Sequence, residues 1–338
     1  MIKRFSTTFF LIISISQAIF AQSQNWVKES IDLTINTKFS QAETLLTNRI
    51  QNGDSSLAVH FYYASVLNSK MTHFENTEEN QSFYDALQFV INKGEAKLER
   101  KDLQEKQKAK TEFYVGSAYG YLAFYQGQIG EWLSAVKNGS RSADYLEQAI
   151  ETDSTIWDAY LGLGAYKYWL STKIDWIPFI PDQREEGIAL IRKTIEHDSY
   201  SKYLAMHQLI YILLDFGEFD QAEELTINII EEYPQSVFMR WAHSHVFMKK
   251  KDFPKAIASY KALLELIDFD PQANPNHKIT CLGRLADMYS RADSCDQAIK
   301  VVQDLNSTNN NKLVDQNEEV QRLLREVSER CGEKDLNN

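Results

Sequence analysis

The stretches that decide the fold are GEFDQAEELTINIIEEYP at 217–234 and KDFPKAIASYKALLELIDFDP at 251–271. Each contains an aromatic residue followed three positions later by alanine, at Phe219 and Ala222 and again, 34 residues further on, at Phe253 and Ala256. Self-similarity at a fixed period of this length indicates a repeat architecture. In such an architecture one unit cannot bury its apolar face alone, so the units stack on one another.

Further copies of this phrase occur along the chain at Phe39–Ala42 and Trp132–Ala135. Another, at Cys295–Ala298, has cysteine in the aromatic position, and Glu185–Gly187 is a copy with glycine in place of alanine. A stretch with helical apolar spacing lies upstream of each copy, and a second amphipathic stretch follows it. We interpret the small residue as the point where two antiparallel helices approach closely. Pro234 ends one unit and Pro254 falls in the first turn of a helix, where its missing N–H costs nothing.

This pattern resembles the tetratricopeptide repeat family, whose unit is a 34-residue helix–turn–helix. The resemblance rests on first-helix pairs, turns and a unit end, found at Leu163-Gly164, Leu285-Ala286, Gly217-Glu218-Phe219, Gly130-Glu131-Trp132 and Tyr233-Pro234. It implies an all-α, right-handed superhelical solenoid of antiparallel helix pairs, with about six to seven units in 22–308. Inserted loops are expected near 70–81 and 172–182, and an irregular helical bundle is the alternative.

The end of the chain, 309–338, is expected to hold a linker, a capping helix and a frayed tail. Within it, Val320, Leu323, Leu324 and Val327 form one apolar face, while the opposite face is charged. A terminal helix with a charged outer face is what the end of a repeat array needs for solubility.

The first 21 residues, MIKRFSTTFFLIISISQAIFA, have the pattern of a secretory signal peptide. Lys3 and Arg4 precede an apolar region that is far shorter than the roughly 20 residues of a membrane span, and Ala21 suits signal peptidase. We expect cleavage near Ala21 and a periplasmic or secreted protein in the cell envelope. The alternative is an uncleaved anchor.

Composition narrows the class of partner. The chain is 43% hydrophobic and 25% charged, which is a globular balance, and its low content of Gly and Pro favours helix. Removing Lys3 and Arg4 with the signal leaves 34 basic residues against 47 acidic ones, a net charge of −13. Nucleic acids and anionic membranes bind basic surfaces, so neither is expected as a partner.

The sequence contains no catalytic or phosphate-binding motif. His243 and His245 are two positions apart on a helix, so they point about 200° apart and cannot share a metal there. We therefore expect no enzymatic activity, no cofactor and no metal.

The resemblance implies that the first helix of each unit lines a concave groove. Anchored on the small residues, the groove positions are Tyr119, Leu122, Gln126, Tyr160, Lys167, Met206, Leu209, Leu213, Arg240, His243 and Phe247. This mixture suits an extended or helical peptide, so the expected function is a non-enzymatic scaffold that binds a protein or peptide partner. The alternative is that these side chains simply pack inside the superhelix.

The loop from Lys173 to Pro181 is rich in apolar residues, including Trp176 and Phe179. It is either an exposed anchor for a partner or a folded-back satellite of the core. A second hypothesis of another class follows from it: an envelope enzyme or small-ligand receptor that uses the groove with the Trp176 loop as a lid.

Three cysteines remain in the exported chain. Cys281 lies at the start of an expected first helix and Cys295 in the turn beyond its far end, about 20 Å away, which is too far for a disulfide. Two antiparallel helices of similar length bring Cys331 back to the level of Cys295. We therefore expect a Cys295–Cys331 disulfide with Cys281 as a buried free thiol. The alternative is three unpaired thiols.

Overall fold

The computed structural model describes residues 26–173, 181–270, 273–307 and 311–332. Every regular element in these ranges is a helix, which confirms the predicted all-α architecture of antiparallel helix pairs. The chain divides into two compact units, residues 1–202 and 203–338. The predicted signal peptide lies outside the described residues.

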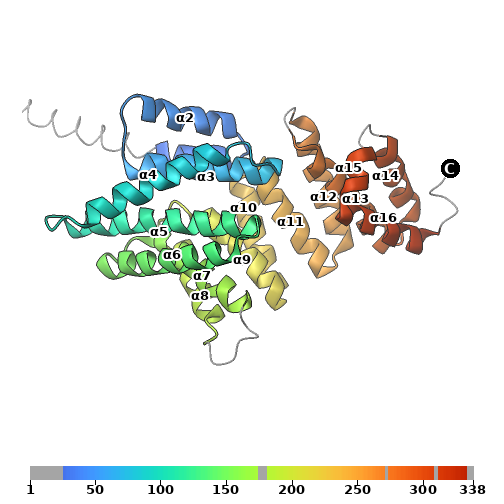
Figure 1. The fold of residues 1–338 in the computed structure, drawn as a ribbon. Helices are drawn as coiled ribbons and strands as arrows, with labels where there is room; N and C mark the ends of the chain where they lie inside the picture. Colours follow the sequence, from blue (N-terminus) through green and yellow to red (C-terminus); the bar gives the residue numbers. More distant parts are fainter. Residues whose placement is uncertain (1–25, 174–180, 271–272, 308–310, 333–338) are drawn as a thin grey trace, which may run out of the picture. The chain divides into compact units, whose positions relative to one another are not determined.

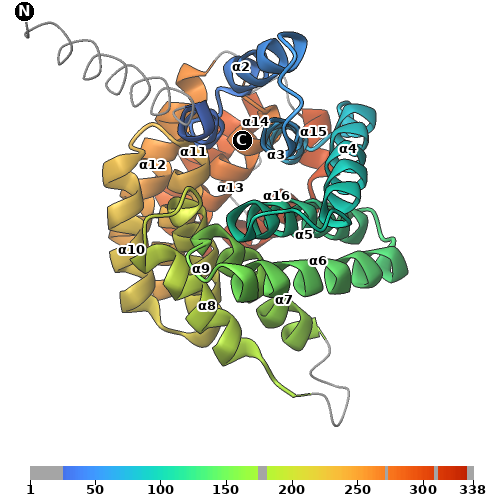
Figure 2. The ribbon, with the colours of Figure 1, turned by 90° about the vertical axis from the view of Figure 1, so that its left-hand side faces the viewer.

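The first unit contains four consecutive helix pairs. Residues 26–35 are helical and precede α2; the helices that follow are α2 (Phe39–Gln51), α3 (Leu57–Phe74), α4 (Asn80–Leu98), α5 (Glu105–Gln128), α6 (Trp132–Thr152), α7 (Trp157–Lys173) and α8 (Arg184–Glu196). From α4 to α8 the helices lie against one another in chain order (Figures 1 and 2). This is the arrangement expected of stacked pairs with short connections.

The second unit contains three pairs and a terminal addition. Its helices are α9 (Lys202–Phe216), α10 (Phe219–Glu232), α11 (Val237–Lys250), α12 (Phe253–Phe269), α13 (Pro275–Arg291), α14 (Cys295–Ser307), α15 (Asn311–Gln316) and α16 (Glu318–Cys331). Consecutive helices from α10 to α14 pack on one another, and α16 packs on α13 (Figure 1). Helix starts are capped as the sequence allows: Ser236 accepts from the Met239 N–H and Asp252 from the Lys255 N–H.

The repeated phrase marks the start of the second helix in five pairs. Its first residue is the first residue of α2, α6, α10, α12 and α14. The residue two positions earlier has a left-handed backbone in every one, with φ of 58° at Thr37, 83° at Gly130, 77° at Gly217, 60° at Lys251 and 54° at Asp293. The five turns therefore share one geometry although only two of them use glycine.

Small residues permit close helix contact. Ala42, Ala222, Ala256 and Ala298 are all fully buried. A Cβ added to Gly164 on α7 would lie 2.6 Å from the carbonyl oxygen of Gly187 on α8, and the converse is equally true. These two glycines therefore let the backbones of α7 and α8 meet, as the sequence predicts for a glycine in place of the phrase alanine.

Two sequence expectations need correction. The insertion expected near 70–81 is mostly helical, because α3 continues to Phe74 and α4 begins at Asn80. In α6 the small packing residue is not Ala135, which is half-exposed, but Gly139, which is buried against Tyr166. Helices α3 to α6 are longer than a standard repeat helix, and this moves the packed turn along the helix.

The terminal helix α16 closes the apolar end of the second unit. Val320, Leu323 and Val327 are buried, and the first two lie over Gly283 of α13. The sulfur atoms of Cys295 and Cys331 are bonded at 2.03 Å, and Cys281 is a buried free thiol. This is the pairing that the helix lengths predict.

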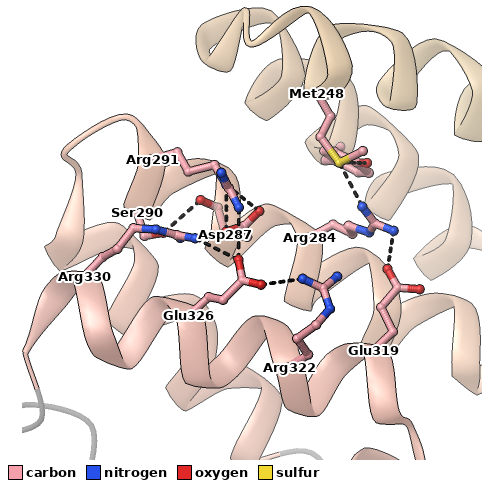
Figure 3. Close-up of polar contacts among 10 residues, drawn as sticks. Met248, Arg284, Asp287, Ser290, Arg291, Glu319, Arg322, Glu326 and Arg330 are labelled. Carbon is pink, nitrogen blue, oxygen red and sulfur yellow. Dashed lines mark hydrogen bonds and ion pairs between the residues drawn. The ribbon is translucent and has the colours of Figure 1, made fainter. Parts of the chain in front are cut away.

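Charged side chains also join α16 to α13 (Figure 3). The buried carboxylate of Asp287 accepts from Arg291 Nε at 2.9 Å and from Arg330 Nη1 at 2.7 Å. Glu326 in turn pairs with Arg291, Arg322 and Arg330. Asp287 therefore has cationic donors from both helices, which stabilise its buried charge.

Membrane-spanning helices are not found in the described ranges, because none of the helices there is both long and apolar enough.

Candidate functional site

An open pocket lies over the middle of the first unit, where α5 runs between α4 and α6. It has a volume of about 360 Å³. Its lining residues are Tyr84, Gln88, Ile91, Asn92 and Glu95 of α4, Tyr119, Leu122 and Gln126 of α5, and Asn138 and Arg141 of α6. The α4 residues recur at helical spacing, so they form one face. We call this site the Glu95 pocket.

A hydrogen-bonded cluster forms one end of the Glu95 pocket. Glu95 Oε1 accepts from the hydroxyl of Tyr119 at 2.8 Å and from the hydroxyl of Tyr145 at 3.1 Å. Arg141 Nη1 donates to the Tyr119 hydroxyl at 3.0 Å. The rings of Tyr119 and Tyr145 are stacked, with centroids 5.9 Å apart and planes 8° apart. Three helices thus hold one carboxylate, two phenols and one guanidinium in fixed positions.

Both phenols are neutral at physiological pH. Burial, and then the neighbouring Glu95, raises the pKa of Tyr145 to about 12. The same two causes raise the pKa of Tyr119. A neutral phenol can donate to a carboxylate, so the cluster is a stable set of donors and acceptors rather than a proton-transfer site.

The remaining walls present amides over an apolar floor. Gln126 Oε1 accepts from Asn138 Nδ2 at 2.8 Å. Gln88 and Asn92 are exposed on the facing helix, and Ile91 and Leu122 are buried beneath them. Such walls can pair with both the donors and the acceptors of a ligand.

The structure brings Tyr119, Leu122 and Gln126 together, but on a different face of α5 from the one expected. They face the second helices α4 and α6. The face of α5 toward the first helix α3 carries Tyr114 and Tyr121 instead, whose rings each lie 5.6 Å from that of Phe61.

On α11, too, the expected groove residues contact parts of the chain other than the neighbouring first helix. His243 Nδ1 lies 2.6 Å from Ser259 Oγ of α12, and Phe247 is buried beside it. Arg240 donates from Nη2 to the Pro234 carbonyl oxygen. The contact between the first helices α9 and α11 is made by other residues, with His207 stacked on Phe238 at 3.9 Å and Tyr211 5.7 Å from His245.

Other expected groove residues are used in packing. Met206, Leu209 and Leu213 are buried in α9. Tyr160 is buried and donates to the Ser154 carbonyl oxygen. Lys167 is held between Glu147 at 3.2 Å and Glu186 at 2.9 Å. These side chains stabilise the helix pairs and offer little surface to a partner.

The loop residues Trp176 and Phe179 lie outside the described residues. Over the ranges that are described, His, Cys, Asp and Glu side chains do not gather in groups of three or more that could hold a metal ion.

No residue of α4 was among the predicted site residues, because no copy of the phrase marks this helix. A signal was present in the polar series Tyr84, Gln88, Asn92 and Glu95, which follows one helix face. Polar residues at this spacing usually indicate a solvated face, so the series alone does not distinguish a pocket wall from ordinary surface.

No family model matches the chain, and no curated protein matches it in sequence. Solved structures do match. PilW, a widely conserved type IV pilus biogenesis factor, is similar with a TM-score of 0.50 and 13% identity over 77% of this chain and 98% of that chain.

Two further structures are less similar. YrrB, described as a TPR protein with an unusual peptide-binding site, gives a TM-score of 0.42 and 13% identity, covering 62% of this chain and 90% of its own. MamA gives 0.40 and 17%, covering 58% and 92%. Together with the helix pairs and the shared turn geometry, the match to PilW shows that this chain has a tetratricopeptide-like fold.

Proposed function

We propose that the chain is a non-enzymatic scaffold of the cell envelope that holds a peptide segment of a protein partner in the Glu95 pocket. The observation that carries this proposal is the facing of amide side chains across an apolar floor. Each peptide unit has one donor and one acceptor, and the amides of Gln88, Asn92 and Asn138 offer both. Ile91 and Leu122 supply apolar contact for a side chain of the peptide.

The chemistry of the pocket favours binding over catalysis. Glu95, Tyr119 and Arg141 bond to one another, and the lining residues include no histidine, cysteine or serine to act as nucleophile or general base. The tetratricopeptide-like fold is consistent with this role, because stacked pairs present extended surfaces for partners.

Export is proposed from the sequence, since Met1 to Ala21 lie outside the described residues. Fractionation of cells that produce the full chain tests this step. The mature protein should be recovered from the periplasm or the medium with its new N-terminus near residue 22. Retention of Lys3 and Arg4 in the isolated protein would contradict export by this signal.

Site-specific crosslinking tests the binding surface. A photo-reactive amino acid placed at Asn92 should form an adduct with an envelope protein. The same group at Gln148, which is exposed on α6 but does not line the pocket, is the matched control. A synthetic peptide copied from the crosslinked segment of the partner should compete with the Asn92 adduct. Equal adducts at both positions would contradict the proposal.

A small-ligand receptor is the second candidate, because about 360 Å³ is within the usual range of small-molecule pockets. Native mass spectrometry of protein isolated from the envelope distinguishes the two. A bound molecule of defined mass that is lost from an Asn92→Trp variant would favour the receptor.

A further inference from the structure

We propose that the Glu95 pocket selects peptides that carry a carboxylate, and that Arg141 is the residue that binds it. This inference rests on the proposed function, because it names the chemistry of the peptide that the pocket holds. The carboxylate comes either from the end of the peptide or from an Asp or Glu side chain within it.

Arg141 is positioned before any ligand arrives. Its Nη1 donates to the Tyr119 hydroxyl at 3.0 Å, and its guanidinium carbon lies 5.3 Å from the centre of the Tyr119 ring. Tyr119 is itself buried and fixed by Glu95. A guanidinium held by a hydrogen bond and a ring loses less conformational entropy when it binds an anion.

Arg141 is nevertheless without a carboxylate partner among the described residues. Several other arginines in those ranges have one within 3.0 Å, such as Arg49 with Asp54 and Arg330 with Asp287. Glu95 lines the same pocket but pairs with the two tyrosine hydroxyls rather than with Arg141. Of the five guanidinium N–H groups, only one has an acceptor in the described part of the chain, so a bidentate pair remains open.

A carboxylate fits this site better than a phosphate does. The planar fork of arginine matches the two oxygens of a carboxylate. Glu95 places a negative charge in the same pocket, and the whole chain has a net charge of −11. Both repel a dianion more strongly than a monoanion. The amides of Asn92 and Asn138 are then available to the peptide groups beside the carboxylate.

The test is an affinity selection on the immobilised chain, read by mass spectrometry. The probes are three pools of randomised pentapeptides: one with free C-termini, one amidated at the C-terminus, and one amidated with a central phosphoserine. The intact chain should enrich peptides with a free C-terminus or, in the amidated pool, peptides that contain Asp or Glu. The first result identifies the terminal carboxylate and the second the side chain.

Variants assign the effect to Arg141. Arg141→Gln should weaken the selected carboxylate peptides by about 10- to 100-fold, the usual effect of losing hydrogen bonds to a charged group. Lys137→Gln removes a neighbouring exposed cation of α6 that does not line the pocket, and should have no such effect. Equal melting temperatures of both variants exclude a folding defect.

The outcomes separate the two proposals. Enrichment of neutral amidated peptides that Asn92→Trp blocks but Arg141→Gln leaves unchanged overturns carboxylate selection and keeps peptide binding. Preference for the phosphoserine pool also overturns it. Peptides that bind equally well to Asn92→Trp, or no enrichment in any pool, overturn the proposed function itself.

Discussion

Helix pairs α5–α6 and α9–α10 carry the same phrase but use it differently. Their turns share a left-handed glycine, Gly130 in one and Gly217 in the other. In α10 the alanine of the phrase, Ala222, is fully buried, whereas in α6 Ala135 is half-exposed and Trp132 is 65% exposed. The phrase therefore fixes where the second helix begins, but not which of its turns is packed.

Helix length explains the difference. α5 and α6 have 24 and 21 residues, against 15 and 14 in α9 and α10. The longer pair extends beyond its neighbours, so the close contact moves one turn along α6, to Gly139. Position in the phrase predicts local geometry, while the packed surface depends on the lengths of both helices.

In α14 the first position of the phrase is a cysteine, Cys295, and it is bonded to Cys331. We expect the largest effect on stability from the loss of this disulfide. Cys295→Ser opens a loop of 36 residues and should lower the free energy of unfolding by about 3.5–4 kcal/mol on the chain-entropy estimate. Denaturant unfolding measures it.

Two further measurements test the disulfide prediction. A reducing agent should lower the stability of the native chain but leave Cys295→Ser unchanged. Peptide mapping of non-reduced protein should show one alkylatable thiol, at Cys281; three would contradict the bridge.

The next prediction compares the two alanines directly. Ala222→Leu adds a branched side chain where no space exists and should cost about 1–3 kcal/mol. Ala135→Leu, at the same place in the phrase, should change stability by less than about 0.5 kcal/mol. Thermal unfolding of both variants decides. Equal losses would mean that the phrase, rather than helix length, sets the packed turn.

These differences show what the sequence predicts reliably. Helix pairs, turn positions and the Cys295–Cys331 pairing depend on local patterns and helix lengths, which are visible in the chain. It is harder to predict which face of a first helix lines a groove, because one side of that helix contacts second helices and the other side contacts neighbouring first helices. His243 and His245 lie on these two sides, and apolar residues occupy both, so the hydrophobic pattern alone does not separate them.

The Glu95 pocket depends on contacts distant in sequence. Glu95 and Tyr145 are 50 residues apart, and their hydrogen bond follows only from the stacking of α4 against α5 and α6. The apolar pattern indicated that α5 was a helix between neighbours. It did not indicate that long helices would leave an open space between α4 and α6.

A smaller effect on stability should be the same in the α5–α6 and α9–α10 pairs. Gly130→Ala and Gly217→Ala each place a Cβ in open space, so the only cost is the left-handed backbone. We expect each to lower the free energy of unfolding by about 1 kcal/mol. Matched chemical denaturation curves test this. A cost at Gly217 alone would show that the α5–α6 turn is not held in the same conformation.

The smallest predicted effect has the opposite sign. Thr37 occupies the position that glycine occupies in the α5–α6 and α9–α10 turns, with φ of 58°, which is unfavourable for a β-branched residue. Thr37→Gly relieves this strain, although the more flexible unfolded chain offsets part of the gain. The net result should be about 0.5–1 kcal/mol of added stability, visible as a higher melting temperature. Thr44→Gly, within the regular backbone of α2, should instead destabilise. If both substitutions destabilise the protein, the left-handed position in the turn before α2 does not favour glycine as the α5–α6 and α9–α10 turns do. The shared turn geometry would then begin only further along the chain.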